Sequence, residues 1–217
     1  MKNLKNRLLF YISYFFLWVG YFVFARLFFL LFYVDKTREL GFTTTLKTFI
    51  YGMRLDVSFA AYLSLVPFLL MLFSFFYNPK KVGKIIKWYS YLLVIIINLL
   101  LIIDAGLYQT WGVRLDTTLL AYINTPEAMI ASVSRFQFIL GSIFWLLFSV
   151  IFIKIFKNIV NKRIQKIVIG NWLQAPLFLL MTIALIIPVR GGFQTIPVNQ
   201  SNVYFSDKMF ANHAAIN

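Results

Sequence analysis

The 217-residue chain contains no cysteine and only one histidine, His213, near its end. The absence of cysteine excludes a disulfide scaffold, a cysteine-ligated metal site and a thiol nucleophile. Acidic residues are scarce too, since seven Asp and Glu against 21 Lys and Arg leave a net charge of +14. No glycine-rich phosphate loop, zinc motif or Ser-His-Asp set can be assembled from the residues that remain. We therefore predict no catalytic residue, no metal site and no cofactor within this chain.

Apolar residues dominate what is present. Hydrophobic residues make up 61% of the chain and charged residues 13%, whereas soluble domains have about 45–50% and about 25%. This composition excludes an ordinary soluble domain, and the many aromatic residues exclude a disordered chain. On so apolar a chain, the positive charge predicts anionic lipid headgroups as the electrostatic partner rather than nucleic acid. The chain is thus expected to be an integral membrane protein.

Long apolar runs give the number of membrane spans. A helix that crosses the hydrocarbon core needs about 20 mainly apolar residues. Five such runs occur, at about 8–33, 57–77, 88–107, 136–156 and 172–189. The first is too long for the apolar core of a signal peptide, and no small-residue cleavage pattern follows it, so we expect it to be retained. The predicted fold class is an all-α membrane protein with five transmembrane helices.

The basic residues are distributed unevenly along this frame. Twelve of them lie in the N-terminal segment and in the loops after the second and fourth spans, without any acidic residue among them. They are Lys2, Lys5, Arg7, Lys80, Lys81, Lys84, Lys87, Lys154, Lys157, Lys162, Arg163 and Lys166. Because basic residues in short loops stay on the cytoplasmic side, we predict a cytoplasmic N-terminus and an extracytoplasmic C-terminus.

Two stretches on the predicted outer side have apolar residues at helical spacing. In 37–53 these are Leu46, Phe49, Ile50 and Met53. In 116–133 they are Leu119, Leu120, Ile123, Met129, Ile130 and Val133. Such spacing predicts short amphipathic helices in the outer membrane interface. They would serve either as loop packing or as a platform for something that rests on the membrane.

Ionisable residues at membrane depth form the candidate site. Each is costly to bury by a few kcal/mol. Arg26, Arg54, Asp56 and Asp104 fall at a similar outer depth, and Arg114 follows shortly after the third span. In one interpretation Arg26 pairs with Asp104 or Asp56 and only joins the helices. In the other, the five residues bind a lipid headgroup, with each Arg neutralising phosphate and each Asp orienting an Arg or accepting from headgroup hydroxyls.

Three segments together resemble a known family. Residues 52–58 read GMRLDVS, with AAY at 60–62. Residues 104–108 read DAGLY, with WGVRLD at 111–116. Residues 190–199 read RGGFQTIPVN, with Asn202, YFS at 204–206 and NHAA at 212–215. Their order is similar to the N-terminal membrane half of the lipoteichoic acid synthase-like family, the membrane-anchored phosphoglycerol transferases and sulfatase-type proteins of bacteria.

The resemblance implies a division of the chain and a role for it. Residues 1–189 would form the transmembrane domain in a bacterial plasma membrane. Residues 190–217 would be the extracytoplasmic linker to a sulfatase-like catalytic domain outside this chain. That domain would carry a Thr nucleophile and a divalent metal, commonly Mn, and would use a lipid donor such as phosphatidylglycerol. The chain itself would be the anchor and lipid entrance.

Apolar residues in the tail fit the linker interpretation if they have nothing to pack against within the chain. They are Phe193, Ile196, Val198, Tyr204, Phe205, Met209, Phe210 and Ile216. Two alternatives remain open. One is the membrane half of a phosphoethanolamine transferase, which the motif at Arg190 fits less well. The other is a self-contained small membrane scaffold or channel subunit.

Overall fold

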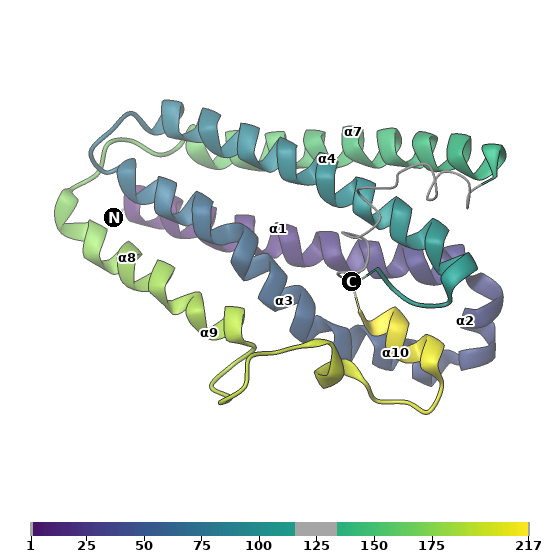
Figure 1. Ribbon diagram of the computed structural model, residues 1–217. Helices are drawn as coiled ribbons and strands as arrows, with labels where there is room; N and C mark the ends of the chain where they lie inside the picture. The colour runs from purple at the N-terminus through teal and green to yellow at the C-terminus, as the bar shows by residue number, and fades with distance from the viewer. Residues whose placement is uncertain (1, 116–133, 217) are drawn as a thin grey trace, which may run out of the picture. The chain divides into compact units, whose positions relative to one another are not determined.

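A computed structural model describes residues 2–115 and 134–216, and each regular element in these ranges is a helix (Figure 1). The long helices are α1 (Lys2–Phe32), α3 (Phe42–Phe73), α4 (Pro79–Trp111) and α7 (Arg135–Ile164). The shorter ones are α2 (Val34–Leu40), η1 (Trp172–Gln174), α8 (Ala175–Ala184), α9 (Ile186–Arg190), η2 (Gln200–Val203) and α10 (Met209–Ala215). The predicted all-α class is confirmed for the described residues.

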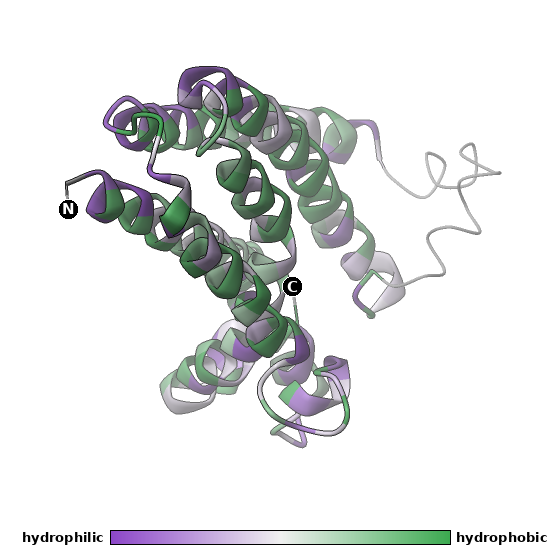
Figure 2. Cartoon of the chain, turned by 90° about the vertical axis from the view of Figure 1, so that its left-hand side faces the viewer, coloured by the Kyte–Doolittle hydropathy of each residue, from purple (hydrophilic) through white to green (hydrophobic). Residues whose placement is uncertain are grey.

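Within residues 2–115 and 134–216, five segments are long and apolar enough to cross a membrane. They are the four long helices, of which α1 contributes Asn3–Phe32, and the segment Trp172–Arg190 that η1, α8 and α9 share. Each overlaps one of the five predicted spans. Hydrophobic residues cover most of the length of these helices (Figure 2). Large apolar side chains such as Phe16, Leu31 and Leu180 are more than 60% exposed, a surface suited to lipid tails rather than water.

The chain forms two compact units, Met1–Tyr89 with Ile155–Asn217, and Ser90–Lys154. Helices α4 and α7 each begin in one unit and end in the other. In the first unit α1 packs along α3, and the Trp18 ring is fully buried 4.6 Å from the ring of Phe156. Ala60 and Ser64 of α3 are small and fully buried, which suits close packing of α3 against its neighbouring helices.

Helix α3 corrects one of the predicted interfacial helices. Residues 42–53 do not form a separate short helix but are the first turns of α3. Residues 37–40 instead belong to α2, and Gly41, with φ of 76°, makes the turn between the two helices. After Gly41 no proline occurs before Pro67, so nothing ends the helix where the prediction placed a boundary. The second predicted interfacial helix, in 116–133, lies outside the described residues.

Pro67 lies inside α3 without interrupting it. Proline has no N–H, so the carbonyl of Leu63, four residues earlier, loses its helical partner. The Tyr89 hydroxyl of α4 donates to this carbonyl at 3.1 Å. An unpaired backbone carbonyl is expensive inside a bilayer, so this hydrogen bond lets α3 remain a membrane-spanning helix through the proline.

Three basic segments of the chain meet at one end of the first unit. Arg7 of α1 donates to the hydroxyl of Ser74, to the Ser74 carbonyl at 3.0 Å and to the Val168 carbonyl at 2.9 Å. Asn6 also donates to the Lys166 carbonyl at 2.7 Å. The N-terminal segment and the loops that follow α3 and α7 therefore share one end, which we call the basic end, as the charge pattern requires.

Candidate functional site

Arg26 of α1 and Asp56 of α3 form an ion pair whose side chains have no exposed surface. The arginine Nη1 donates to Asp56 Oδ2 at 2.5 Å, and its Nη2 donates to Oδ1 at 2.9 Å. Two parallel hydrogen bonds of this kind are among the strongest polar contacts in proteins. Of the two partners predicted for Arg26, the structure selects Asp56.

The same guanidinium also holds the C-terminal tail. Its Nε donates to the Ala214 carbonyl at 3.1 Å, and its Nη2 donates to the Ala215 carbonyl at 3.1 Å. Both carbonyls lie in the last turn of α10, where helix geometry leaves carbonyls without an intrahelical donor. A cation is also favourable at the C-terminal end of a helix. Arg26 thus joins three segments that are far apart in the sequence: α1, α3 and α10.

Gly52 provides the space for this junction. A Cβ at this position would stand 2.5 Å from the Ala215 carbonyl oxygen and closer still to the Arg26 guanidinium. No side chain fits there unless the arginine or the tail moves. Gly52 precedes Asp56 by one helical turn, so the same face of α3 supplies the carboxylate and the space beside it.

Apolar contacts extend the attachment of the tail. A buried cluster joins Leu55 of α3 to Val203, Ala215 and Ile216, with Val198 and Phe205 packed against it. The ring of Phe210 stacks on Phe29 at 5.8 Å, and that of Phe205 stacks on Tyr51 at 4.7 Å.

The expectation that the apolar tail residues have nothing to pack against is therefore wrong for Val198, Phe205, Phe210 and Ile216. Their partners are residues of α1 and α3, which remote sequence positions do not reveal. Phe193 and Ile196 differ from these four, because their side chains are 90% and 67% exposed.

Asn212 stabilises the fold of the tail itself. Its side-chain oxygen accepts from the backbone N–H groups of Phe205 at 2.9 Å and Ser206 at 3.1 Å. Its amide nitrogen donates to the Ser206 carbonyl at 2.7 Å, and the residue is only 4% exposed. The Lys208 ammonium donates to the Glu39 carbonyl at 2.5 Å and so connects the tail to α2 as well.

A second ion pair lies in the other unit of the chain. Arg114 Nη2 is 2.7 Å from Asp104 Oδ2, and both side chains are largely buried. The second carboxylate oxygen of Asp104 accepts from the backbone N–H of Leu115 at 2.7 Å. This pair fixes the chain just after α4 ends.

The five predicted site residues thus divide into one ion pair in each unit and one exposed residue, Arg54. Four of the five N–H groups of Arg26 are already used within the protein. The Arg54 side chain makes no hydrogen bond or ion pair with any described residue. Of the two predicted site arginines in the first unit, Arg26 and Arg54, Arg54 is the one whose guanidinium can meet a phosphate.

Sequence reasoning missed the main-chain part of this site. Gly52 was visible only as part of a motif, and nothing in the sequence marked the carbonyls of Ala214 and Ala215 as ligands of Arg26. In the described part of the chain, no group of three His, Asp or Glu side chains comes together to hold a metal ion.

The fold and the buried charges define a multi-pass helical membrane protein whose tail is attached to its own helices. No protein-family model, curated protein or solved structure matches the chain.

Proposed function

We propose that this chain is the plasma-membrane anchor and lipid entrance of a bacterial phosphoglycerol transferase-like protein. Its N-terminus would be cytoplasmic, and its tail would lead to an extracytoplasmic catalytic domain that uses a divalent metal such as Mn. The proposal rests on the two hydrogen bonds that Arg26 donates to the Ala214 and Ala215 carbonyls. A tail fixed in this way gives whatever follows it a defined position at the membrane surface.

Two of the three motif segments that suggest the family meet at this point. Gly52 and Asp56 belong to the first segment, and Ala214 and Ala215 belong to the last. Arg54 lies between Gly52 and Asp56 on α3 and is exposed. We assign Arg54 the role of binding the phosphate of the donor lipid, with phosphatidylglycerol as the proposed donor.

The test is the change Arg54→Ala in the complete protein, assayed on a lipid donor and on a soluble chromogenic ester. Loss of one charged hydrogen-bonding group predicts a fall of about tenfold or more on the lipid donor and none on the ester. Lys47→Ala is the matched control, because Lys47 is exposed on α3 two turns earlier. Equal losses on both substrates, or equal losses from both variants, would count against the lipid-entrance role.

The packed tail also favours a second candidate, a self-contained membrane scaffold or channel subunit. Val203, Ala215 and Ile216 are buried against Leu55, as a tail without a further domain would need. The codons that follow Asn217 distinguish the two. A reading frame that continues into a domain with clustered Asp, His and Thr supports the anchor, and an immediate stop supports the scaffold.

A further inference from the structure

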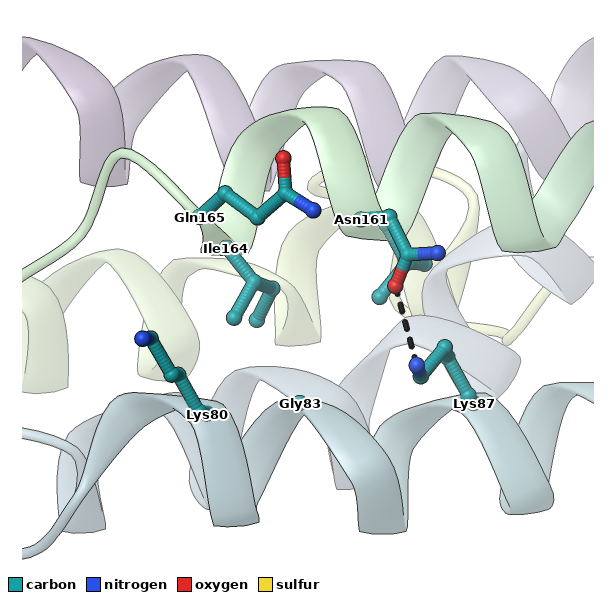
Figure 3. A pocket seen from close by; sticks show the side chains of 7 residues that line it. Lys80, Gly83, Lys87, Asn161, Ile164 and Gln165 are labelled. Carbon is teal, nitrogen blue, oxygen red and sulfur yellow. Dashed lines mark hydrogen bonds between the residues drawn. The ribbon is translucent and has the colours of Figure 1, made fainter.

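A pocket of about 440 Å³ lies between the start of α4 and the end of α7, within the first unit (Figure 3). Its lining residues are Lys80, Gly83 and Lys87 of α4, and Val160, Asn161, Ile164 and Gln165 at the end of α7. The spacing of three and four residues puts the three α4 positions on one face of the helix. The pocket is therefore built into the packing of two membrane-spanning helices at the basic end.

Gly83 brings the two helices together at the pocket. A Cβ there would stand 2.7 Å from Cγ2 of Ile164, so a side chain at this position would require the Ile164 side chain to move. Lys80 and Lys87 lie on either side of the Gly83–Ile164 contact, and both side chains extend from α4 toward α7 (Figure 3). Two ammonium groups thus flank one small space.

The polar groups around this space suit an anion. The Lys87 ammonium donates to Asn161 Oδ1 at 2.9 Å, which leaves two of its N–H groups and the Asn161 amide hydrogens as donors. Lys80 is exposed, and its ammonium group makes no hydrogen bond or ion pair with a described residue, although its backbone N–H donates to Asn78. No carboxylate is among the lining residues. Two positive charges therefore face the pocket without a described acid to neutralise them.

The position of the pocket identifies the source of the anion. Helix α4 begins at Pro79 and α7 ends at Ile164, so the pocket lies at the ends of two spans, level with lipid headgroups. Trp88, beside Lys87, is 65% exposed, as tryptophan commonly is at a membrane interface. Basic pockets between transmembrane helices are a known form of headgroup site.

We propose that this pocket binds the phosphate of an anionic phospholipid headgroup. The proposal is independent of the function proposed above, because the pocket lies at the basic end and uses neither Arg54 nor the tail. It also adds a defined site to the general attraction that twelve basic residues exert on anionic lipid.

The test measures binding of phosphatidylglycerol to the purified full chain by native mass spectrometry, with phosphatidylcholine as the zwitterionic comparison. The double variant Lys80→Gln/Lys87→Gln is expected to lose about tenfold or more in affinity for phosphatidylglycerol. The matched control Lys84→Gln/Lys162→Gln removes the same charge from exposed positions outside the pocket and is expected to lose about twofold or less. Lys80→Arg/Lys87→Arg is expected to keep the affinity.

Equal losses in the two glutamine double variants would overturn the proposal, because they would show a general effect of surface charge. Inorganic phosphate that competes with the lipid at millimolar concentration would overturn the assignment to a lipid. If the double variant does not fold, Lys80→Gln alone tests the site, since the exposed Lys80 ammonium makes no hydrogen bond or ion pair with a described residue that the change would remove. Unchanged lipid affinity in that variant would refute the site.

Discussion

The two buried arginines of α1 both carry a charge that must be stabilised inside the protein, but different groups stabilise it. Arg7 and Arg26 are 1% and 0% exposed and lie 19 residues apart, a rise of about 28 Å along the helix. This distance is close to the thickness of a hydrocarbon core, about 30 Å. Arg26 is neutralised by Asp56, whereas Arg7 donates to carbonyls and to the Ser74 hydroxyl, its Cζ lies 3.9 Å from the centre of the Phe75 ring, and it forms no ion pair with a described residue.

This difference follows the charge asymmetry of the sequence. The basic segments around Arg7 contain no acidic residue, so no carboxylate is available there, whereas Asp56 lies on α3 at the depth of Arg26. At the basic end the guanidinium keeps its charge close to the anionic headgroups expected there. At the other end, the ion pair neutralises the charge of the guanidinium, and its remaining N–H groups donate to carbonyls of the tail. A buried arginine thus holds segments together at each end of the first unit, and a carboxylate partner is present only for the arginine away from the basic end.

The largest loss of stability is expected when the Asp56 carboxylate is removed. Asp56→Ala leaves Arg26 charged, buried and without a counterion, and a loss of about 3–5 kcal/mol in stability is expected. Unfolding of the purified protein in mixed micelles measures this loss. Asp35→Ala is the control, because Asp35 is 89% exposed and its contact with Arg38 is 3.7 Å long. A loss below about 1 kcal/mol for Asp56→Ala would show that the pair is unimportant.

Arg7→Met tests the arginine that has no carboxylate. The change removes the charge together with its donors and leaves the buried Ser74 carbonyl without this donor, whereas the part-buried Val168 carbonyl keeps the side chain of Asn3 as a donor. The expected cost is about 1–3 kcal/mol, less than that of Asp56→Ala, in the same unfolding assay. Lys5→Met, at an exposed position two residues earlier, is the control. A larger loss of stability in Arg7→Met than in Asp56→Ala would show that Arg7 contributes more to stability than the Arg26–Asp56 pair.

The smallest and most local effects are expected from changes at the glycines beside the two arginines. Gly52→Ala places a methyl group against Arg26 and the Ala215 carbonyl, whereas Gly170→Ala places one 2.7 Å from the Phe75 ring and 3.3 Å from Arg7. Because the chain has no cysteine, a single Ala211→Cys change gives a buried reporter on α10.

Thiol labelling of this reporter is expected to be about tenfold faster with Gly52→Ala, since overpacking promotes local opening of the tail. Gly170→Ala, at the basic end, is expected to leave the labelling rate unchanged. Equal rates in the two glycine variants would mean that Gly52 does not control the attachment of the tail.

The sequence allowed the spans to be predicted because long apolar runs are a local property. It also put Arg26 and Asp56 at a similar level, as their ion pair confirms, but the choice between Asp56 and Asp104 depends on how helices rotate and pair, which hydropathy does not encode. The boundary near residue 53 was placed wrongly, because apolar spacing alone does not distinguish an interfacial helix from the beginning of a longer one. The packing of Phe210 on Phe29 joins residues 181 positions apart, beyond any local pattern.

The attachment of α10 through main-chain oxygens has a consequence for sequence variation. Every amino acid offers the same carbonyl, so Arg26 does not select the side-chain chemistry at positions 214 and 215. Both alanines are nonetheless completely enclosed, which restricts volume instead. Natural or engineered versions of this protein should therefore accept serine or glycine at these two positions and reject leucine, even though leucine is the better helix former of the three.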